Sequence, residues 1–345
     1  MLKRQGCSPE KGDILISKDG EKCLNLIFVY SQNEEIVLLS SIAIVRLNEK
    51  NNPLFYRYYL LSPVGQSIMK KWFRSGTAIP RVVLKDFRNV PVPKVPFQEQ
   101  VNIANILLYL DTKIANFQKQ NQTLEKITQT LFKQWFVDFN FLDENGKPYK
   151  DNGGEMVGSE LGEIPLGWRV KKLGRCLKAL IDNRGKTPKF VESGIPALSA
   201  KFVKNGNVIN RDKFNFVPHD LFNQSEKLLT DDIIMTSEAP LGELYYVSEN
   251  TLYYPAQRVF AIRADRQVVL PSYLYFWLDS FVGQYLVKRR GSGSTVQGIK
   301  QSELKECEVI IPDRKLMDLA DSSLKVILLT IPSPLSRSFF DMNTS

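Results

Sequence analysis

Histidine and cysteine are scarce in this chain of 345 residues, which has one histidine and four cysteines. A zinc site usually draws its ligands from closely spaced pairs of these residues. Cys7, Cys23, Cys176 and Cys307 form no such pair, so we expect ordinary reduced thiols and no metal site. A single histidine also argues against a catalytic triad that uses histidine as its base. His219 lies in the turn-like stretch FVPHDLF, and we expect it to be structural.

Other features of enzymes and membrane proteins are also absent. No run of about 18 apolar residues is present, so no membrane helix is expected, and the charged N-terminus lacks the apolar core of a secretory signal. There is no GxGxxG or NPPY motif, and RGKT (184–187) has Leu180 where a P-loop needs glycine. No acid–base pair of carboxylates can be named. These absences favour a cytoplasmic protein that is not an enzyme and has no cofactor of its own.

Basic residues exceed acidic ones by 46 to 37, which gives a net charge of +9, and they are unevenly placed. Residues 57–94 contain eight Lys or Arg against one acid, Asp86, and residues 183–213 contain seven against two. Such segments suit a polyanion, because every phosphate that a cation neutralises releases counterions. A solvated protein surface would have the same composition.

The most informative feature of the sequence is an internal repeat. Four segments recur in the same order, the last three at an offset of 217 or 218 residues. The pairs are GDILIS (12–17) with DDIIMTS (231–237), AIVR (43–46) with FAIR (260–263), PLFYRYYLLSPVGQ (53–66) with PSYLYFWLDSFVGQ (271–284), and SGTAIPRVVLKDF (75–87) with SGSTVQGIKQSEL (292–304). Each copy mixes short apolar runs with aromatic-rich segments of helical spacing, which predicts duplicated α+β units.

A different kind of segment separates the two copies. Residues 98–136 contain no glycine or proline, and Pro96 stands just before them. Two rows with a spacing of seven run through the segment: Ile103, Leu110, Phe117, Leu124 and Leu131, and Leu107, Ile114, Asn121, Thr128 and Trp135. This heptad pattern predicts a coiled-coil helix roughly 58 Å long, in which the polar Asn121 would fix the register. An ordinary amphipathic helix lying on a globular core is the alternative.

Several motifs resemble those of the specificity subunits of type I restriction-modification systems. PRVVLKDFRNVPVPKVPFQEQ (80–100), followed by LYLDTKIANFQKQNQTLEKITQTLFKQWFVDF (108–139), is similar to the central spacer helix of that family. GEIPLGW (162–168) resembles the opening of its target recognition domains, and EAPLGELYYV (238–247) looks like a signature inside one. The resemblance covers roughly residues 1–330.

The resemblance implies a noncatalytic subunit that recognises double-stranded DNA. Two target recognition domains would each read half of a split sequence, and spacer helices would set the distance between the halves. Methyltransferase (M) subunits would dock along the helices, and a separate restriction and motor (R) subunit would cleave DNA. S-adenosylmethionine, ATP and Mg²⁺ would be used by those partners and not by this chain.

The two ends depart from the family pattern. About 68 residues separate Glu163 from Asp231, whereas only 11 precede Gly12, so the first recognition domain is expected to be incomplete. A distal spacer helix starts near Asp313, and Pro332 and Pro334 would stop it. The expected parts are a partial first target recognition domain (1–97), the central spacer helix (98–139), a linker (140–162), the second recognition domain (163–312), the start of the distal spacer helix (313–331) and an irregular tail (332–345).

Three segments are candidates for DNA contact, because cations hold phosphates, loop amides approach closely and glutamine can pair with adenine. They are KRRGSGSTVQGIK (288–300), its counterpart KKWFRSGTAIPR (70–81) and NRGKTPK (183–189). The residues selected are Lys70, Lys71, Arg74, Thr77, Arg81, Asn183, Arg184, Lys186, Lys288, Arg289, Arg290, Ser292, Ser294, Thr295, Gln297 and Lys300. Basic surface loops without a ligand are the alternative.

The helix rows define a second predicted site, the coiled-coil or subunit interface. Its residues are Ile103, Leu107, Leu110, Ile114, Phe117, Asn121, Leu124, Leu131 and Trp135. Two further hypotheses remain open at this stage. The chain could be a truncated remnant that binds the methyltransferase subunit through its coiled coil but no longer specifies a DNA sequence, or two copies could pair through the spacer helix into a homodimer.

Overall fold

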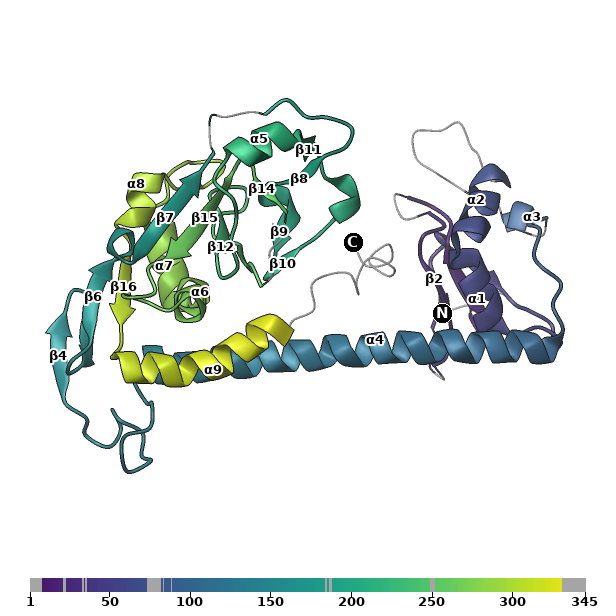
Figure 1. Ribbon diagram of the computed structural model, residues 1–345. Helices are drawn as coiled ribbons and strands as arrows, with labels where there is room; N and C mark the ends of the chain where they lie inside the picture. Colours follow the sequence, from purple (N-terminus) through teal and green to yellow (C-terminus); the bar gives the residue numbers. More distant parts are fainter. Residues whose placement is uncertain are drawn as a thin grey trace. The chain divides into compact units, whose positions relative to one another are not determined.

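The computed structural model describes residues 8–330 except 21–22, 33, 35, 73–81, 83, 88, 184, 186–187 and 249–251. The chain forms two compact units, and the division falls in the sequence between Gln118 and Lys119. Both units contain helices and antiparallel strands, so the predicted α+β class is confirmed (Figure 1). Cys7 and the predicted tail (332–345) lie outside the described residues.

Unit 1 is built on an antiparallel sheet with the strand order β2-β1-β3. Its elements are β1 (Ile14–Ser17), β2 (Ile27–Val29), β3 (Ile42–Val45), α1 (Pro53–Leu61), α2 (Pro63–Trp72), α3 (Leu84–Phe87) and the first part of α4. Ile14 and Ile16 of the sheet form its core together with Phe55 and Leu60 of α1 and Met69 of α2. The β-branched residues in β1 and β3 favour a strand, and their packing on aromatic helix residues explains the fold of the unit.

The start of α1 is set by two local signals. The Asn52 side chain accepts a hydrogen bond from the Phe55 amide at 3.1 Å, and Pro53 occupies the first turn. The buried amide of Gln100, in the first turn of α4, accepts from the Asn52 amide at 2.8 Å and donates to the Val95 carbonyl oxygen at 2.8 Å. The first turn of α4 is therefore fixed to the rest of unit 1.

Unit 2 has a central antiparallel sheet with the strand order β13-β12-β15-β7 and a smaller sheet with the order β11-β8-β14. Its strands are β4 (Met156–Ser159), β5 (Gly162–Pro165), β6 (Arg169–Lys172), β7 (Leu177–Asp182), β8 (Ile195–Leu198), β9 (Val203–Lys204), β10 (Asn207–Val208), β11 (Phe216–Val217), β12 (Ile233–Thr236), β13 (Leu244–Tyr246), β14 (Tyr254–Pro255), β15 (Val259–Ala264) and β16 (Glu308–Ile311). Its helices, besides short 3-10 turns, are α5 (His219–Gln224), α6 (Pro271–Asp279), α7 (Phe281–Arg289), α8 (Gln301–Lys305) and α9 (Arg314–Thr330). His219 is exposed at the start of α5.

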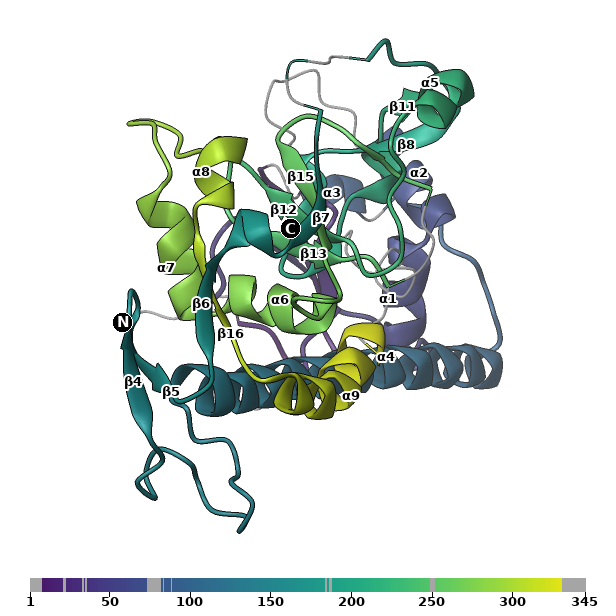
Figure 2. The same cartoon turned by 60° about the vertical axis from the view of Figure 1, so that its left-hand side comes forward.

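The long helix predicted between the copies is present as α4 (Phe97–Phe132), which continues as a π-helical segment (Lys133–Val137). Its 36 residues span about 54 Å at the usual rise. Within unit 2, α9 runs beside the last turns of α4 in both views (Figures 1 and 2). Leu324 and Leu328 of α9 belong to the same core cluster as Phe132 and Phe136.

The predicted duplication is visible in the pairing of the strands. β12 pairs with β13 and β15 in the way that β1 pairs with β2 and β3. Ile14 lies opposite Val45 in unit 1, and Ile233 lies opposite Ile262 in unit 2, at the same offset as the repeated motifs. β12 therefore corresponds to β1, β13 to β2 and β15 to β3.

Candidate nucleic-acid interface

The loop of residues 291–298, between α7 and α8, carries several of the predicted DNA-contact residues. Ser292 and Gly298 exchange two backbone hydrogen bonds of 2.8 and 2.9 Å, which close the loop. Gly293 has a φ of +114°, and a Cβ there would lie 2.2 Å from the Val296 carbonyl oxygen, so this position needs glycine. The Ile299 amide donates to the Ser237 carbonyl oxygen at 2.9 Å, which ties the loop to the end of β12. The loop is therefore presented on a fixed base.

The loop forms one wall of an open hollow of about 590 Å³. The other wall is residues 239–243, which follow β12 and contain the cis peptide bond Ala239–Pro240. The Gln284 side chain in α7 donates to the Gly242 carbonyl oxygen at 2.9 Å and so holds this wall in place. The hollow is lined by Ala239, Pro240, Leu241, Gly242, Glu243, Gln284, Lys288, Thr295, Val296 and Gln297. Both the EAPLGELYYV signature and the Gly/Ser loop therefore face one site.

Most of the predicted DNA contacts around this loop are exposed. They are Lys288, Ser292, Ser294, Thr295, Gln297 and Lys300. The ammonium groups of Lys288 and Lys300 form no ion pair with any residue that the structure describes. Gln297 donates from Nε2 to the Lys288 carbonyl oxygen at 2.7 Å, so one of its amide hydrogens is engaged within the protein. The two lysines are the cations best placed to meet a phosphate.

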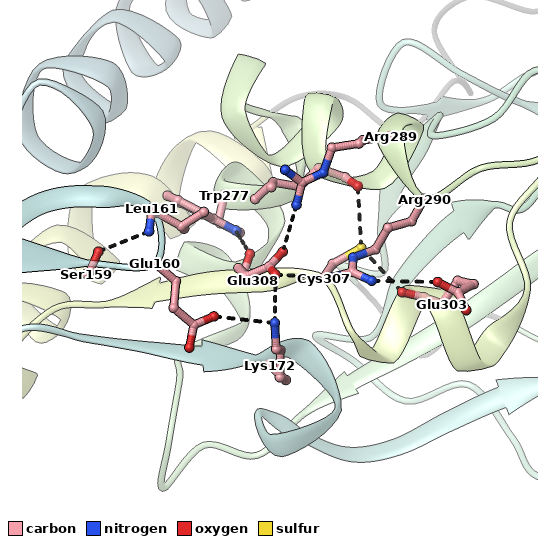
Figure 3. Close-up of polar contacts among 11 residues, drawn as sticks. Ser159, Glu160, Leu161, Lys172, Trp277, Arg289, Arg290, Glu303, Cys307 and Glu308 are labelled. Carbon is pink, nitrogen blue, oxygen red and sulfur yellow. Dashed lines mark hydrogen bonds and ion pairs between the residues drawn. The ribbon is translucent and has the colours of Figure 1, made fainter.

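Arg289 and Arg290, by contrast, turn toward the buried carboxylate of Glu308 in β16 (Figure 3). Arg290 lies 3.1 Å from Glu308 and 3.6 Å from Glu303, and its side chain is 23% exposed. Arg289 lies 3.8 Å from Glu308 and stacks over the Tyr285 ring at 5.8 Å. The run of three cations in the sequence therefore separates into one free lysine and two arginines that pair within the domain.

Lys172 of β6 completes this cluster, because its Nζ lies 2.6 Å from Glu308 Oε1 (Figure 3). Burial raises the pKa of Glu308, but hydrogen bonds from Lys172 and Arg290 outweigh that effect and leave the pKa below its ordinary value. Glu308 is therefore a carboxylate at neutral pH. The ion pairs of Glu308 with these three cations hold β6, the end of α7 and β16 together. The cluster therefore has a structural role, because α7 also carries Gln284 and Lys288 of the hollow.

The remaining candidates of the second unit lie elsewhere. Asn183 is buried, and its Nδ2 donates to the Pro255 carbonyl oxygen at 2.7 Å, so the side chain holds the strand backbone. Arg184 and Lys186 lie outside the described residues. In unit 1, Lys70 and Lys71 are exposed in the last turn of α2, whereas Arg74, Thr77 and Arg81 lie outside the described residues. The DNA contacts of all of these residues stay predictions.

Sequence reasoning did not select residues 239–243 or Gln284 as part of the site. The signal for Gln284 was present in the repeat, because VGQ ends both aromatic segments. Gln66 donates to the Leu24 and Leu60 carbonyl oxygens at 2.9 and 3.0 Å, and Gln284 donates to those of Gly242 and Leu278, both at 2.9 Å. Gln66 and Gln284 therefore hold equivalent loops, the one between β1 and β2 and the one between β12 and β13.

Four of the nine predicted interface residues of α4 are exposed. Leu110 is 50% exposed, Phe117 59%, Leu124 36% and Leu131 42%. The other predicted interface residues, which are Ile103, Leu107, Ile114, Asn121 and Trp135, are partly buried. The fully buried positions of the helix are Gln100, Ala104, Thr128 and Phe132, which pack on the units themselves, and Thr128 belongs to the second predicted row. The apolar row therefore stays available for a partner.

The residues that the structure describes include no candidate for a membrane span or a metal site. No helix among them is both long and apolar enough to cross a membrane. Within the same residues, no group of three or more His, Cys, Asp or Glu side chains is placed to hold a metal ion. The described cysteines are free thiols, and burial raises the pKa of Cys176 to about 11 and that of Cys307 to about 12.

Parts of the chain are similar to proteins of known family. The family model for the type I restriction modification DNA specificity domain matches residues 2–126. The type I restriction enzyme MjaIX specificity subunit of Methanocaldococcus jannaschii is 35% identical over 164 residues, which cover 46% of this chain and 36% of that protein. Over these residues the chain is similar to type I specificity subunits.

A second relative and one solved structure extend the match. The MjaVIII specificity subunit of the same organism is 28% identical over 281 residues, which cover 78% of this chain and 61% of that protein. The crystal structure of a type I restriction-modification S subunit from M. genitalium covers 96% of this chain and 78% of that chain, with a TM-score of 0.52 at 16% identity, and so shares its fold. The chain thus spans only 36% and 61% of the lengths of the two relatives.

Proposed function

We propose that this specificity-subunit homologue is a noncatalytic DNA-recognition subunit of a type I restriction-modification complex. It would bind one half of a split target through the hollow of unit 2 and scaffold the methyltransferase and restriction subunits in the cytoplasm. The observation that carries the proposal is the fixed loop 291–298, which presents exposed Ser, Thr and Gln side chains between two unpaired lysines, Lys288 and Lys300. Cations at the rim of a polar loop combine phosphate binding with base readout.

The polar loop has the chemistry that major-groove recognition requires. Thr295 and Gln297 stand on the wall of the hollow and carry hydroxyl and amide groups that can meet base edges. Glu243 on the opposite wall is an acceptor that suits the exocyclic amine of cytosine. Because Gln284 and Gly293 fix the two walls, recognition would take place on a preformed surface.

The exposed row on α4 supports the scaffolding part of the proposal. Solvated helices rarely carry an apolar residue at every seventh position over four repeats, unless another helix covers them. In the proposed complex the methyltransferase subunit covers Leu110, Phe117 and Leu124. S-adenosylmethionine, ATP and Mg²⁺ are then bound by the partner subunits, and pairing of two copies through the same row is the competing arrangement.

The test is to co-express the chain with a methyltransferase subunit of a type I system from the same organism and to purify the complex through a tag on this chain. A stable complex that methylates DNA in the presence of S-adenosylmethionine, while the isolated chain has no turnover with DNA and Mg²⁺, supports the proposal. Turnover by the isolated chain contradicts it. A complex whose DNA binding shows no sequence preference at several salt concentrations identifies the chain as a remnant that only binds its partner.

A further inference from the structure

An ion pair between Arg258 and Glu238 adjoins the loop of residues 291–298. Arg258 Nε lies 3.0 Å from Glu238 Oε1. Glu238 pairs with Gly298 of the loop in an antiparallel β-bridge. A Cβ at Gly298 would lie 3.1 Å from the Cβ of Glu238, so the glutamate packs directly against the loop. The ion pair therefore belongs to the surface next to the polar loop on which the proposed function depends.

The backbone of Arg258 is fixed relative to the same loop. The Ser237 amide donates to the Arg258 carbonyl oxygen at 2.9 Å, and the Ile299 amide donates to the Ser237 carbonyl oxygen at 2.9 Å. Arg258 stands in the turn between β14 and β15, between the buried residues Ala256 and Val259. Its φ is +66°, a left-handed conformation that costs free energy in residues other than glycine. The Arg258 side chain is therefore presented from a fixed position.

The ion pair is too exposed to explain by itself why this backbone conformation is kept. The side chains of Arg258 and Glu238 are 58% and 39% exposed, and ion pairs at such exposure contribute little to stability. Backbone strain of this kind is concentrated at binding and catalytic sites. A role of Arg258 in binding therefore explains the arrangement better than a role in stability.

The repeat supports the same conclusion, because unit 1 has no arginine at this position. The hydrogen bond of 2.9 Å from the Lys18 amide to the Ser41 carbonyl oxygen matches the bond that Arg258 accepts in unit 2. Ser41 is therefore the counterpart of Arg258, and its backbone is not left-handed. Structural residues such as Gln66 and Gln284 occur in both copies. Arg258 thus distinguishes unit 2 from unit 1, as is expected of a residue that determines specificity.

The carboxylate of Glu238 decides which part of DNA suits Arg258. Lys288 and Lys300 form no ion pair with a described residue and can each meet a phosphate, whereas a carboxylate beside Arg258 repels one. Guanine presents two acceptors, N7 and O6, in the major groove, and its partner cytosine presents the N4 amine as a donor. Because Arg258 turns Nε toward Glu238, its Nη1–Nη2 edge can donate to guanine while the glutamate accepts from cytosine. The ion pair therefore complements both bases of a G·C pair.

From these observations we infer that Arg258 binds the guanine of one G·C pair in the major groove of the DNA target, a role that rests on the proposed function. Arg258 is then a specificity-determining residue, and its planar guanidinium makes the contact to guanine bidentate. Glu238 is a positioning residue, because it holds the guanidinium beside the loop. The G·C pair lies next to the bases that the loop of residues 291–298 contacts.

Selection from a random duplex library tests this role. The test protein is the complex of the full-length chain with the methyltransferase subunit, and the bound duplexes are sequenced. At one G·C position, the parent complex should bind the G·C duplex at least about fivefold more tightly than the A·T duplex, whereas Arg258→Ala should bind the two equally. Arg258→Lys should also lose this preference, because lysine keeps the charge but not the planar fork. Glu238→Gln should reduce the same preference and leave the other positions unchanged.

Arg169→Ala is the matched control, because Arg169 is exposed in β6, and this variant should enrich the same sequence as the parent. Arg258→Lys keeps the test decisive if alanine disturbs the turn. Variants of Arg258 that keep every preference of the parent overturn the role. Equal weakening of binding to all sequences, with a salt slope lower by about one, also overturns it, because Arg258 then contacts a phosphate. A parent complex that enriches no sequence contradicts the proposed function itself, so the two failures are distinguishable.

Discussion

Arg263 donates two hydrogen bonds, of 2.9 and 2.8 Å, to the carboxylate of Asp232. In unit 1, Arg46 donates two hydrogen bonds of 2.8 Å to the carboxylate of Asp13. Each aspartate directly precedes the first strand of its repeat; Arg46 directly follows β3, and Arg263 is the second-last residue of β15. The same ion pair therefore links the equivalent strands in both sheets. The duplication thus extends from the strand order to a pair of interacting side chains.

Loss of this pair should destabilise unit 2. Arg263→Met would leave the Asp232 carboxylate, which is 1% exposed, without its partner. Removing one member of a buried pair costs about 3–5 kcal/mol, and because the Arg263 side chain is 18% exposed we expect about 2–3 kcal/mol. Guanidinium unfolding followed by tryptophan fluorescence measures this loss in the free energy of unfolding, because Trp135, Trp168 and Trp277 all lie in unit 2.

Lys133→Met is the control for this loss. It removes an ion pair to Asp138 whose side chains are 65% and 41% exposed, so the free energy of unfolding should change by less than about 1 kcal/mol. Equal losses for the two variants would contradict the structural role of the Arg263–Asp232 pair.

A glycine at the junction of α6 and α7 should be irreplaceable. A Cβ at Gly283 would lie 2.0 Å from the Trp277 carbonyl oxygen, and a Cβ at Gly65 would lie 2.0 Å from that of Tyr59. Gly283→Ala should therefore lower the free energy of unfolding by about 1–3 kcal/mol or more, in the same denaturation experiment. Gly158→Ala, where nothing lies within 4 Å, should leave stability nearly unchanged, and a large loss there would show that the contact is not the cause.

Lys288 should contribute to DNA affinity by forming an ion pair with a DNA phosphate. Lys288→Ala is expected to reduce the slope of log affinity against log salt by about one unit, because one fewer counterion is released. Binding of duplex DNA at several salt concentrations measures the slope. Lys147→Ala removes the same charge from an exposed position in the linker and should leave the slope unchanged. Equal effects of both variants would indicate nonspecific charge attraction.

Because of the Glu308 cluster, we expect the folded protein to lose stability in acid. Burial raises the pKa of Glu308, but bonds from Lys172 and Arg290 hold it below its ordinary value of 4.5 in the folded protein. The stabilisation is therefore fully present above that value and is lost as the pH falls below it, toward the folded-state pKa. Glu308→Gln should be less stable than the parent at neutral pH and should lose less stability on acidification. Parallel pH profiles of the two proteins would contradict this.

The exposed row on α4 should matter for assembly and not for folding. Replacing Leu110, Phe117 and Leu124 by serine is expected to change the free energy of unfolding by about 0.5 kcal/mol or less per site. The same variant should lower recovery of the methyltransferase subunit at least about tenfold in co-purification. Thr112→Ser, Lys119→Ser and Lys126→Ser lie on the opposite face and should retain the partner. Retention by both variants would exclude this face as the interface.

Much of the fold follows from the sequence because its signals are local or repeated. The heptad spacing from Ile103 to Trp135 and the lack of glycine or proline predicted α4, and the repeated motifs predicted that β1 and β12 are equivalent. The same pattern did not reveal which stripe of α4 is buried. Gln100 and Thr128 are polar, yet they are buried: Gln100 accepts from the Asn52 amide, and Thr128 donates to the Leu124 carbonyl oxygen of its own helix, while the apolar Phe117 stays exposed.

The site was predicted less completely, because charge composition does not specify a partner. Arg290 belongs to a run of three cations, but a carboxylate of β16 faces it once that strand folds against β6. Asn183 lies in a basic stretch, but the backbone of β14 takes its amide hydrogen. Both partners lie far away in the sequence, so only the tertiary structure separates these side chains from the free Lys288.

The most direct measurement is a map of methylated adenines in DNA exposed to the complex of this chain with its methyltransferase subunit. The account predicts modification at one defined sequence, and a changed or degenerate sequence when Thr295 and Gln297 are replaced by alanine. Modification that is independent of sequence, or a sequence unaffected by those two replacements, would contradict it.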